Sequence, residues 1–211
     1  MKRLLSLFLF LFFLSSCDKG SDLNIEEASL PETAEIYLLN NLGHLPGFCL
    51  DVAEEWPDGR APMQSAGAQN MNVDLDKPLQ AHSCHSIRAS NSLGGTGFGG
   101  VSADQGFDIS KIDGGEFNLP SFSVCVEVEN PGQRSDLLLR DCDQNPNQKF
   151  VFEDDGKIKP VGNPDLCLTV SNNYFVYGGV YMSKYYVRDL FLSACNPFFA
   201  KRQSWGLRLD N

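Results

Sequence analysis

The sequence predicts an all-β fold made of three internal repeats, because one pattern of residues occurs three times in order. Each repeat has a cysteine within an alternating apolar and polar run, a second cysteine after another apolar run, and then a glutamine two residues before a large aromatic residue. Turn sequences at 113–115 and 154–156 separate short segments, which favours a barrel or a sandwich. The repeated positions are Cys49, Cys84 and Gln105; Cys125, Cys142 and Gln148; and Cys167, Cys195 and Gln203.

The apolar positions of each repeat predict the core. Residues on either side of each first cysteine alternate as half-buried strands do. We expect the large aromatic side chains after the glutamines to fill the core near a pseudo-threefold axis, and the glutamines to bond to backbone. These aromatic residues are Phe107, Phe150 and Trp205.

The repeated pattern resembles the ricin-type β-trefoil lectin family, whose hallmarks are Cys-Leu-Asp-Val, a second cysteine, and Gln-x-Trp or Gln-x-Phe. The resemblance covers residues 34–211, with repeats at 34–113, 114–155 and 156–211. It implies a β-trefoil, a pseudo-threefold barrel with a cap. It also implies non-catalytic carbohydrate binding in shallow surface pockets, with galactose-like sugars as the usual ligands.

Seven cysteines are present, and six remain when Cys17 is set aside. Six cysteines allow fifteen pairings, and export to an oxidising compartment makes disulfides plausible. The repeats of the resemblance select one disulfide inside each repeat: Cys49–Cys84, Cys125–Cys142 and Cys167–Cys195.

A metal site is the competing interpretation of these cysteines. No close Cys-x-x-Cys pair exists, and His82 and His85 are the only histidines near a cysteine. We therefore expect no metal and no cofactor.

The N-terminus predicts a lipoprotein signal over residues 1–16. Lys2 and Arg3 precede an apolar run that is too short to span a bilayer, and Ser15-Ser16-Cys17 fits the end of a bacterial lipobox. Cys17 would then carry the lipid, and residues 17–33 would form an acidic tether to a domain held outside the cytoplasm. An ordinary secretion signal with an incidental cysteine is the alternative. The sequence does not distinguish the outer from the inner membrane.

The formal net charge of −10 argues against nucleic acid and against electrostatic attachment to anionic lipid. The acidic residues are scattered, so the simplest interpretation is a solvated surface.

The resemblance implies a sugar site in the first repeat. In this family a carboxylate two residues after the first cysteine accepts hydrogen bonds from sugar hydroxyls, and a glutamine and an aromatic ring precede the second cysteine. An Asn-Gln pair completes the clamp, and here Asp replaces that Asn. The predicted carbohydrate-binding residues are Asp51, Gln80, His82, Asp104 and Gln105. Trp56 or Phe98 could supply a stacking ring larger than His82.

The other repeats match the sugar pattern less well. The second keeps Glu127, Asn147 and Gln148 as weaker candidates, but Leu138 and Arg140 replace the glutamine and the aromatic. The third has lost the key groups, with Thr169, Phe191, Ser193 and Arg202 in their places.

A different function is a structural or protein-interaction role through the inserted loops 53–78, 86–104 and 173–186. We expect no enzyme. The Gly-x-Gly-x-x-Gly spelling at Gly95–Gly100 lacks the strand and helix of a dinucleotide site. Nothing in the sequence separates the pKa values of Asp51 and Asp104 as a glycosidase pair requires.

Overall fold

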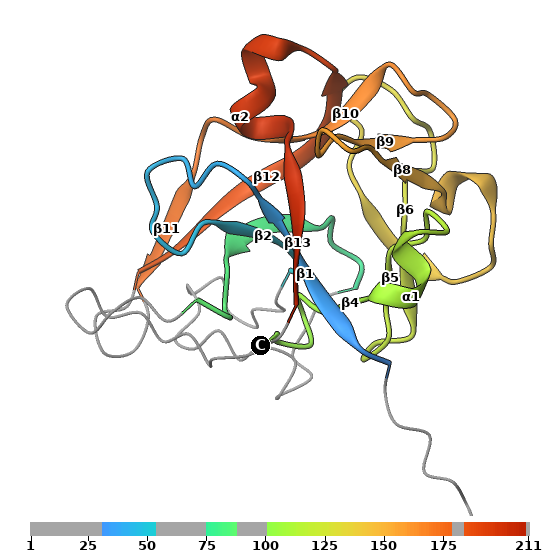
Figure 1. Ribbon diagram of the computed structural model, residues 1–211, viewed down its shortest axis with the longest axis horizontal. Helices are drawn as coiled ribbons and strands as arrows, with labels where there is room; N and C mark the ends of the chain where they lie inside the picture. The colour runs from blue at the N-terminus through green and yellow to red at the C-terminus, as the bar shows by residue number, and fades with distance from the viewer. Residues whose placement is uncertain (1–30, 54–74, 88–100, 179–183, 210–211) are drawn as a thin grey trace, which may run out of the picture.

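The computed structural model describes residues 31–53, 75–87, 101–178 and 184–209. Each repeat contributes four strands, which Figure 1 shows wound around a common centre. The first repeat contains β1 (Thr33–Leu38), β2 (Phe48–Asp51), β3 (Gln80–Ser83) and β4 (Phe107–Asp108). The second contains β5 (Asn118–Leu119), β6 (Val124–Glu127), β7 (Leu138–Asp141) and β8 (Phe150–Phe152). The third contains β9 (Ile158–Pro160), β10 (Leu166–Val170), β12 (Lys184–Ala194) and β13 (Trp205–Leu209), with an additional β11 (Phe175–Gly178).

The strand pairing follows the same plan in each repeat. The second and third strands form an antiparallel hairpin: β2 with β3, β6 with β7, and β10 with β12. Strand β1 pairs with β13 from Ala34↔Leu209 to Leu38↔Trp205, and with β4. Strand β8 pairs with β9 across the boundary between the second and third repeats. This threefold arrangement is a β-trefoil, so the predicted fold is confirmed.

The three predicted disulfides are confirmed, and they occupy equivalent places. In each repeat the first cysteine lies within the second strand, and the second cysteine directly follows the partner strand. The Cα atoms of each pair are 5.0 Å apart. Closing loops of this length stabilises a fold by about 3 kcal/mol each in the entropic model.

The predicted aromatic residues lie in the core. Phe107, Phe150 and Trp205 are all buried in one apolar cluster. The rings of Phe117 and Phe150 stack with centroids 5.0 Å apart. The indole of Trp205 donates to the carbonyl of Leu168 at 3.1 Å, which satisfies its one polar atom.

Strand β12 breaks the threefold symmetry. Its C-terminal half pairs with β10 inside the third repeat, and its N-terminal half pairs with β11. It also pairs with β3 of the first repeat, where Val187 faces His82. In Figure 1 the orange β11 and β12 reach from the third repeat to the first. Part of the segment predicted as an inserted loop at 173–186 is therefore a hairpin.

Two short helical segments complete the described fold: α1 (Ile109–Ile112) and α2 (Ala200–Gln203). Two 3₁₀ turns span Pro146–Gln148 and Pro197–Phe199. Among the described residues, no helix has the length and apolar character needed to cross a membrane. The predicted signal and Cys17 lie outside the described residues, as does all of the tether before residue 31.

Two glycines with positive φ give a matched test of the turn between β8 and β9. Gly156 has φ +82°, and a Cβ there would lie 2.5 Å from the carbonyl oxygen of Trp205. Gly43 has φ +81°, and a Cβ there would meet no atom within 4 Å. We expect Gly43→Ala to cost about 1–2 kcal/mol for the left-handed conformation alone.

Gly156→Ala should cost clearly more, because the backbone of β13 must also move. Urea unfolding of both variants measures the difference. If both variants lose the same free energy of unfolding, the contact of residue 156 with Trp205 relaxes without cost.

Candidate functional site

One glutamine in each repeat makes the same set of backbone hydrogen bonds. Its Nε2 donates to the carbonyl just before the second cysteine, and its Oε1 accepts from the N–H just after that cysteine. The donor bonds are Gln105 to Ser83 (3.2 Å), Gln148 to Asp141 (2.8 Å) and Gln203 to Ala194 (3.0 Å). The accepted bonds come from His85 (2.9 Å), Asp143 (3.2 Å) and Asn196 (3.0 Å). The predicted backbone role of these glutamines is confirmed.

The same amide also reaches the residue two positions after the first cysteine. Gln105 donates to Asp51 at 2.5 Å, Gln148 to Glu127 at 2.9 Å, and Gln203 to the hydroxyl of Thr169 at 2.9 Å. The frame of the three sites is therefore shared. What differs is the acceptor: a short carboxylate, a longer carboxylate and a hydroxyl.

The first repeat brings all five predicted carbohydrate-binding residues together. Asp51 and Gln80 face each other across β2 and β3, and Gln80 donates to Asp51 at 3.1 Å. The Nδ1 atom of His82 lies 3.8 Å from Asp51 Oδ2. The carbonyl of Asp104 accepts from Val52 N at 3.2 Å, as that of Asn147 accepts from Val128 N at 3.0 Å. Asp104 and Gln105 therefore match Asn147 and Gln148 despite the long insertion.

These side chains are more deeply buried than the shallow pocket that the resemblance implies. The exposed fraction is 2% for Asp51, 6% for His82 and 1% for Asp104. Strand β3 lies between β2 and β12, so His82 has Cys49 on one side and Val187 on the other. Gln80 is the partly exposed member of the set.

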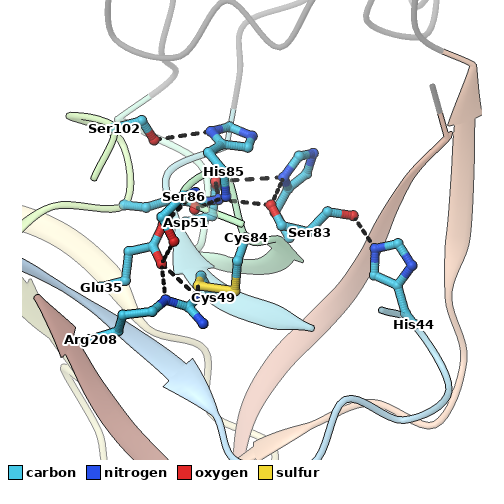
Figure 2. The surroundings of a disulfide bond; sticks show 12 residues. Glu35, His44, Cys49, Asp51, Ser83, Cys84, His85, Ser86, Ser102 and Arg208 are labelled. Carbon is cyan, nitrogen blue, oxygen red and sulfur yellow. Dashed lines mark hydrogen bonds and ion pairs between the residues drawn. A yellow bond between two sulfur atoms is a disulfide. The ribbon is translucent and has the colours of Figure 1, made fainter. Parts of the chain in front are cut away.

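Sequence reasoning did not assign His85 to the site, although His85 lies within it. Figure 2 shows His85 beyond the Cys49–Cys84 disulfide with its ring directed at Ser102. Its Nδ1 is 3.0 Å from Ser102 Oγ and 3.7 Å from Asp104 Oδ1. The hydroxyl of Ser102 donates to Asp104 in turn. The sequence feature that could have identified His85 is the histidine itself, because the other repeats have Asp143 and Asn196 at this position.

Burial and neighbouring charges raise the pKa values of two residues in this cluster and lower those of two others. Burial, and then the charge of Asp104, raise the pKa of Asp51 well above its usual value. Burial, and then His85, lower the pKa of His82 to about 3. For His85, burial opposes the charged form, but the hydrogen bond and charge of Asp104 outweigh it and raise the pKa to about 9. For Asp104 the desolvation penalty is likewise outweighed by His85, and its pKa is lowered.

The second repeat keeps a carboxylate at this position, but its hydrogen-bond partners lie within the same repeat. Glu127 accepts from Asn145 at 2.7 Å as well as from Gln148. The side chain of Asn147 donates to the carbonyl of Glu129 at 3.2 Å, and Arg140 pairs with the Glu129 carboxylate at 3.0 Å.

The third repeat has no carboxylate at the key position. Thr169 donates to the carbonyl of Cys167 at 2.8 Å, and Arg202 donates to that of Val170 at 3.2 Å. Both side chains are therefore engaged by backbone. Trp56, Phe98 and the segment Gly95–Gly100 lie outside the described residues, as do large parts of the predicted insertions 53–78 and 86–104.

No protein-family model and no curated protein matches this sequence. Among solved structures, the mdaA-1 domain is 16% identical, with 88% of this chain and 95% of that chain covered and a TM-score of 0.48. The C-half of an earthworm R-type lectin in complex with GalNAc is 10% identical, with coverage of 85% and 99% and a TM-score of 0.44. The β-trefoil lectin of the Vibrio vulnificus hemolysin/cytolysin with bound N-acetyl-D-lactosamine is 16% identical, with coverage of 87% and 98% and a TM-score of 0.43. The β-trefoil assignment rests on the chain's own threefold pairing, and the chain resembles the ricin-type β-trefoil lectins.

A histidine beside the site gives a pH prediction. His44 Nε2 lies 2.7 Å from Ser83 Oγ, and its ring centroid is 4.3 Å from that of Tyr186. Burial, and then the charge of Arg188, lower the pKa of His44 to about 4. The unfolded chain therefore binds this proton first as the pH falls below about 6.5. The contribution of His44 to stability is present above that pH and is lost as the pH falls towards 4.

A titration followed by NMR of the His44 ring should show a neutral imidazole at pH 5.5. The same resonance in urea-unfolded protein, titrating near pH 6.5, is the reference. A folded-state midpoint near 6.5 would contradict the prediction.

Proposed function

We propose that this protein binds carbohydrate without catalysis, mainly through the first repeat. The observation that carries the proposal is the Asp51 carboxylate held between Gln80 and Gln105, at the position that the ricin-type pattern reserves for sugar hydroxyls. A carboxylate offers about four lone-pair sites. The two glutamine bonds leave acceptor capacity for the adjacent hydroxyls of a pyranose.

The burial of the cluster indicates where a sugar would approach. Four of the five predicted residues are buried, whereas Gln80 is partly exposed. We therefore propose that the sugar approaches from the Gln80 side of the cluster, where its hydroxyls would reach the Asp51 carboxylate. The second repeat is a weaker site, because Glu127, Asn147 and Gln148 are engaged within the repeat.

Anchoring would compensate for a weak single site. A single site of this kind binds with about −4 to −5 kcal/mol, which corresponds to sub-millimolar affinity. A lipid on Cys17 would hold many copies on one bacterial membrane, outside the cytoplasm, and so raise avidity. Galactose-like sugars are the first ligands to test. The earthworm and Vibrio structures contain GalNAc and N-acetyl-D-lactosamine, respectively.

A glycan array with the wild type, Asp51→Ala and Thr169→Ala tests this proposal. Both substitutions remove the acceptor of a buried glutamine at the same repeat position, but only the first removes a carboxylate. We expect Asp51→Ala to lose glycan retention and Thr169→Ala to keep it. Thermal midpoints of all three proteins control for unfolding.

If the folded wild type binds none of the arrayed glycans, the proposal is wrong for those glycans. Equal binding by wild type and Asp51→Ala would move the site out of the first repeat.

A protein-interaction role is the second candidate, because three neighbouring side chains of the third repeat are exposed and apolar. The exposed fractions are 52% for Tyr174, 57% for Phe175 and 46% for Val176. Under this alternative, replacing Phe175 and Val176 with serine abolishes partner binding and Asp51→Ala does not. The glycan array separates the two functions, because the serine variant should bind sugar like the wild type.

A further inference from the structure

We propose that Asp51, His82 and His85 bind a divalent transition-metal ion, with Zn²⁺ as the best match. One potential ligand atom from each residue lies within 4.8 Å of the other two, and all three residues are buried. The described residues contain two other groups of this kind, but each depends on the cysteines of a disulfide. Sulfur atoms bonded to each other are not thiolate ligands, so only the histidine-containing group has three usable donors.

The donor chemistry selects the metal. Two imidazoles and one carboxylate form a usual set for zinc sites that keep a position for water, whereas Mg²⁺ and Ca²⁺ prefer oxygen alone. Ligand bonds of about 2.0–2.1 Å place tetrahedral ligand atoms about 3.3 Å apart. Asp51 Oδ2 and His82 Nδ1 are 3.8 Å apart, so a small movement of these side chains brings them within range.

The surroundings orient the ligands as outer-shell groups do in metal sites. The hydroxyl of Ser102 donates to Asp104, so its oxygen accepts from His85 Nδ1. With Nδ1 held by Ser102, Nε2 is the ring nitrogen that would bind a metal, and the metal would displace the proton that the raised pKa of about 9 keeps on the ring at neutral pH. His82 Nδ1 contacts the carbonyl of Ser83 at 3.0 Å, and that carbonyl also accepts from Gln105. The carbonyl therefore keeps a partner if His82 turns to a metal.

The other repeats show that the fold does not need a histidine at the position of His85. At the position of His85 they have Asp143 and Asn196, whose backbone N–H groups also donate to the repeat glutamine. Their side chains cap local turns, accepting from Asn145 N at 3.0 Å and Phe198 N at 2.9 Å. The imidazole of His85 takes neither of these structural roles, and it is directed at Ser102 and Asp104.

Charge balance also favours a cation here. Asp51 and Asp104 are both buried, and buried carboxylates are normally paired or bound to metal. Asp104 already has His85 beside it, whereas burial and the charge of Asp104 oppose the charged form of Asp51, so a dication bound to Asp51 would stabilise that carboxylate. The inference does not depend on carbohydrate binding, although both would use Asp51.

Calorimetric titration with zinc sulfate tests the site. The full chain is produced without a polyhistidine tag, kept oxidised so that the disulfides remain intact, and stripped with EDTA. We expect one equivalent of Zn²⁺ to bind at micromolar concentration or below, while Mg²⁺ does not bind. Substituting Co²⁺ should give the visible absorption of a four-coordinate site.

Matched variants locate the ion. His85→Asn and His82→Asn should each weaken zinc binding by at least about a hundredfold, and Asp104→Asn by about 10–100-fold as a positioning residue. His44→Asn removes the third histidine of the chain, which lies outside the cluster, and should bind like the wild type. If one variant fails to fold, the others still decide the question.

Absence of zinc binding by the folded wild type would overturn the inference. Unchanged affinity in His82→Asn and His85→Asn would do the same, because the ion would then lie elsewhere. Glycan retention measured with and without EDTA is scored separately, so a failed metal site and a failed sugar site give different results.

Discussion

The buried glutamine of each repeat is the interaction on which the rest of the structure depends. Gln105, Gln148 and Gln203 are fully buried, and each uses its amide to join the first-cysteine strand to the chain around the second cysteine. Each also lies two residues before a core aromatic. Replacing such a side chain would leave several buried partners unsatisfied, at about 1–3 kcal/mol for each group. The disulfide, the glutamine and the aromatic residue therefore form one unit, repeated three times.

The elements that could be predicted from the sequence are those that recur. The three disulfides, the glutamine contacts and the aromatic core follow from residues that match between repeats. The pairing of β12 with β3 could not be predicted, because it joins Ser83 to Tyr186 across 103 positions of chain without a repeated pattern. The same holds for Glu35, which is fully buried and held by Arg208 at 2.6 Å across 173 positions. His85 was missed because it marks a departure from the pattern.

The chemistry of the site comes from departures within a constant frame. At one equivalent position the three repeats have Asp51, Glu127 and Thr169. The amide of the repeat glutamine donates a hydrogen bond to each of them. Only the first repeat adds two imidazoles and a second buried carboxylate. A shared frame can tolerate this collection of polar groups because the disulfide and the backbone hydrogen bonds of the glutamine are the same in all three repeats, whichever side chains surround them. Figure 2 shows the arrangement, with the cluster beside Cys49–Cys84 and the pair of Glu35 and Arg208.

The long strand β12 has a consequence for how the chain is made. A ribosome releases the first repeat before the last, yet β3 lacks its outer neighbour until residues 187–189 have emerged. Strand β1 stays without its partner β13 for longer still, because β13 is the last strand to be synthesised. In that interval the hairpin of the first repeat presents an unpaired edge, which is open to pairing with other chains. Protection of this edge is therefore most needed before the C-terminal strands arrive, and truncated chains would be left with the same edge exposed.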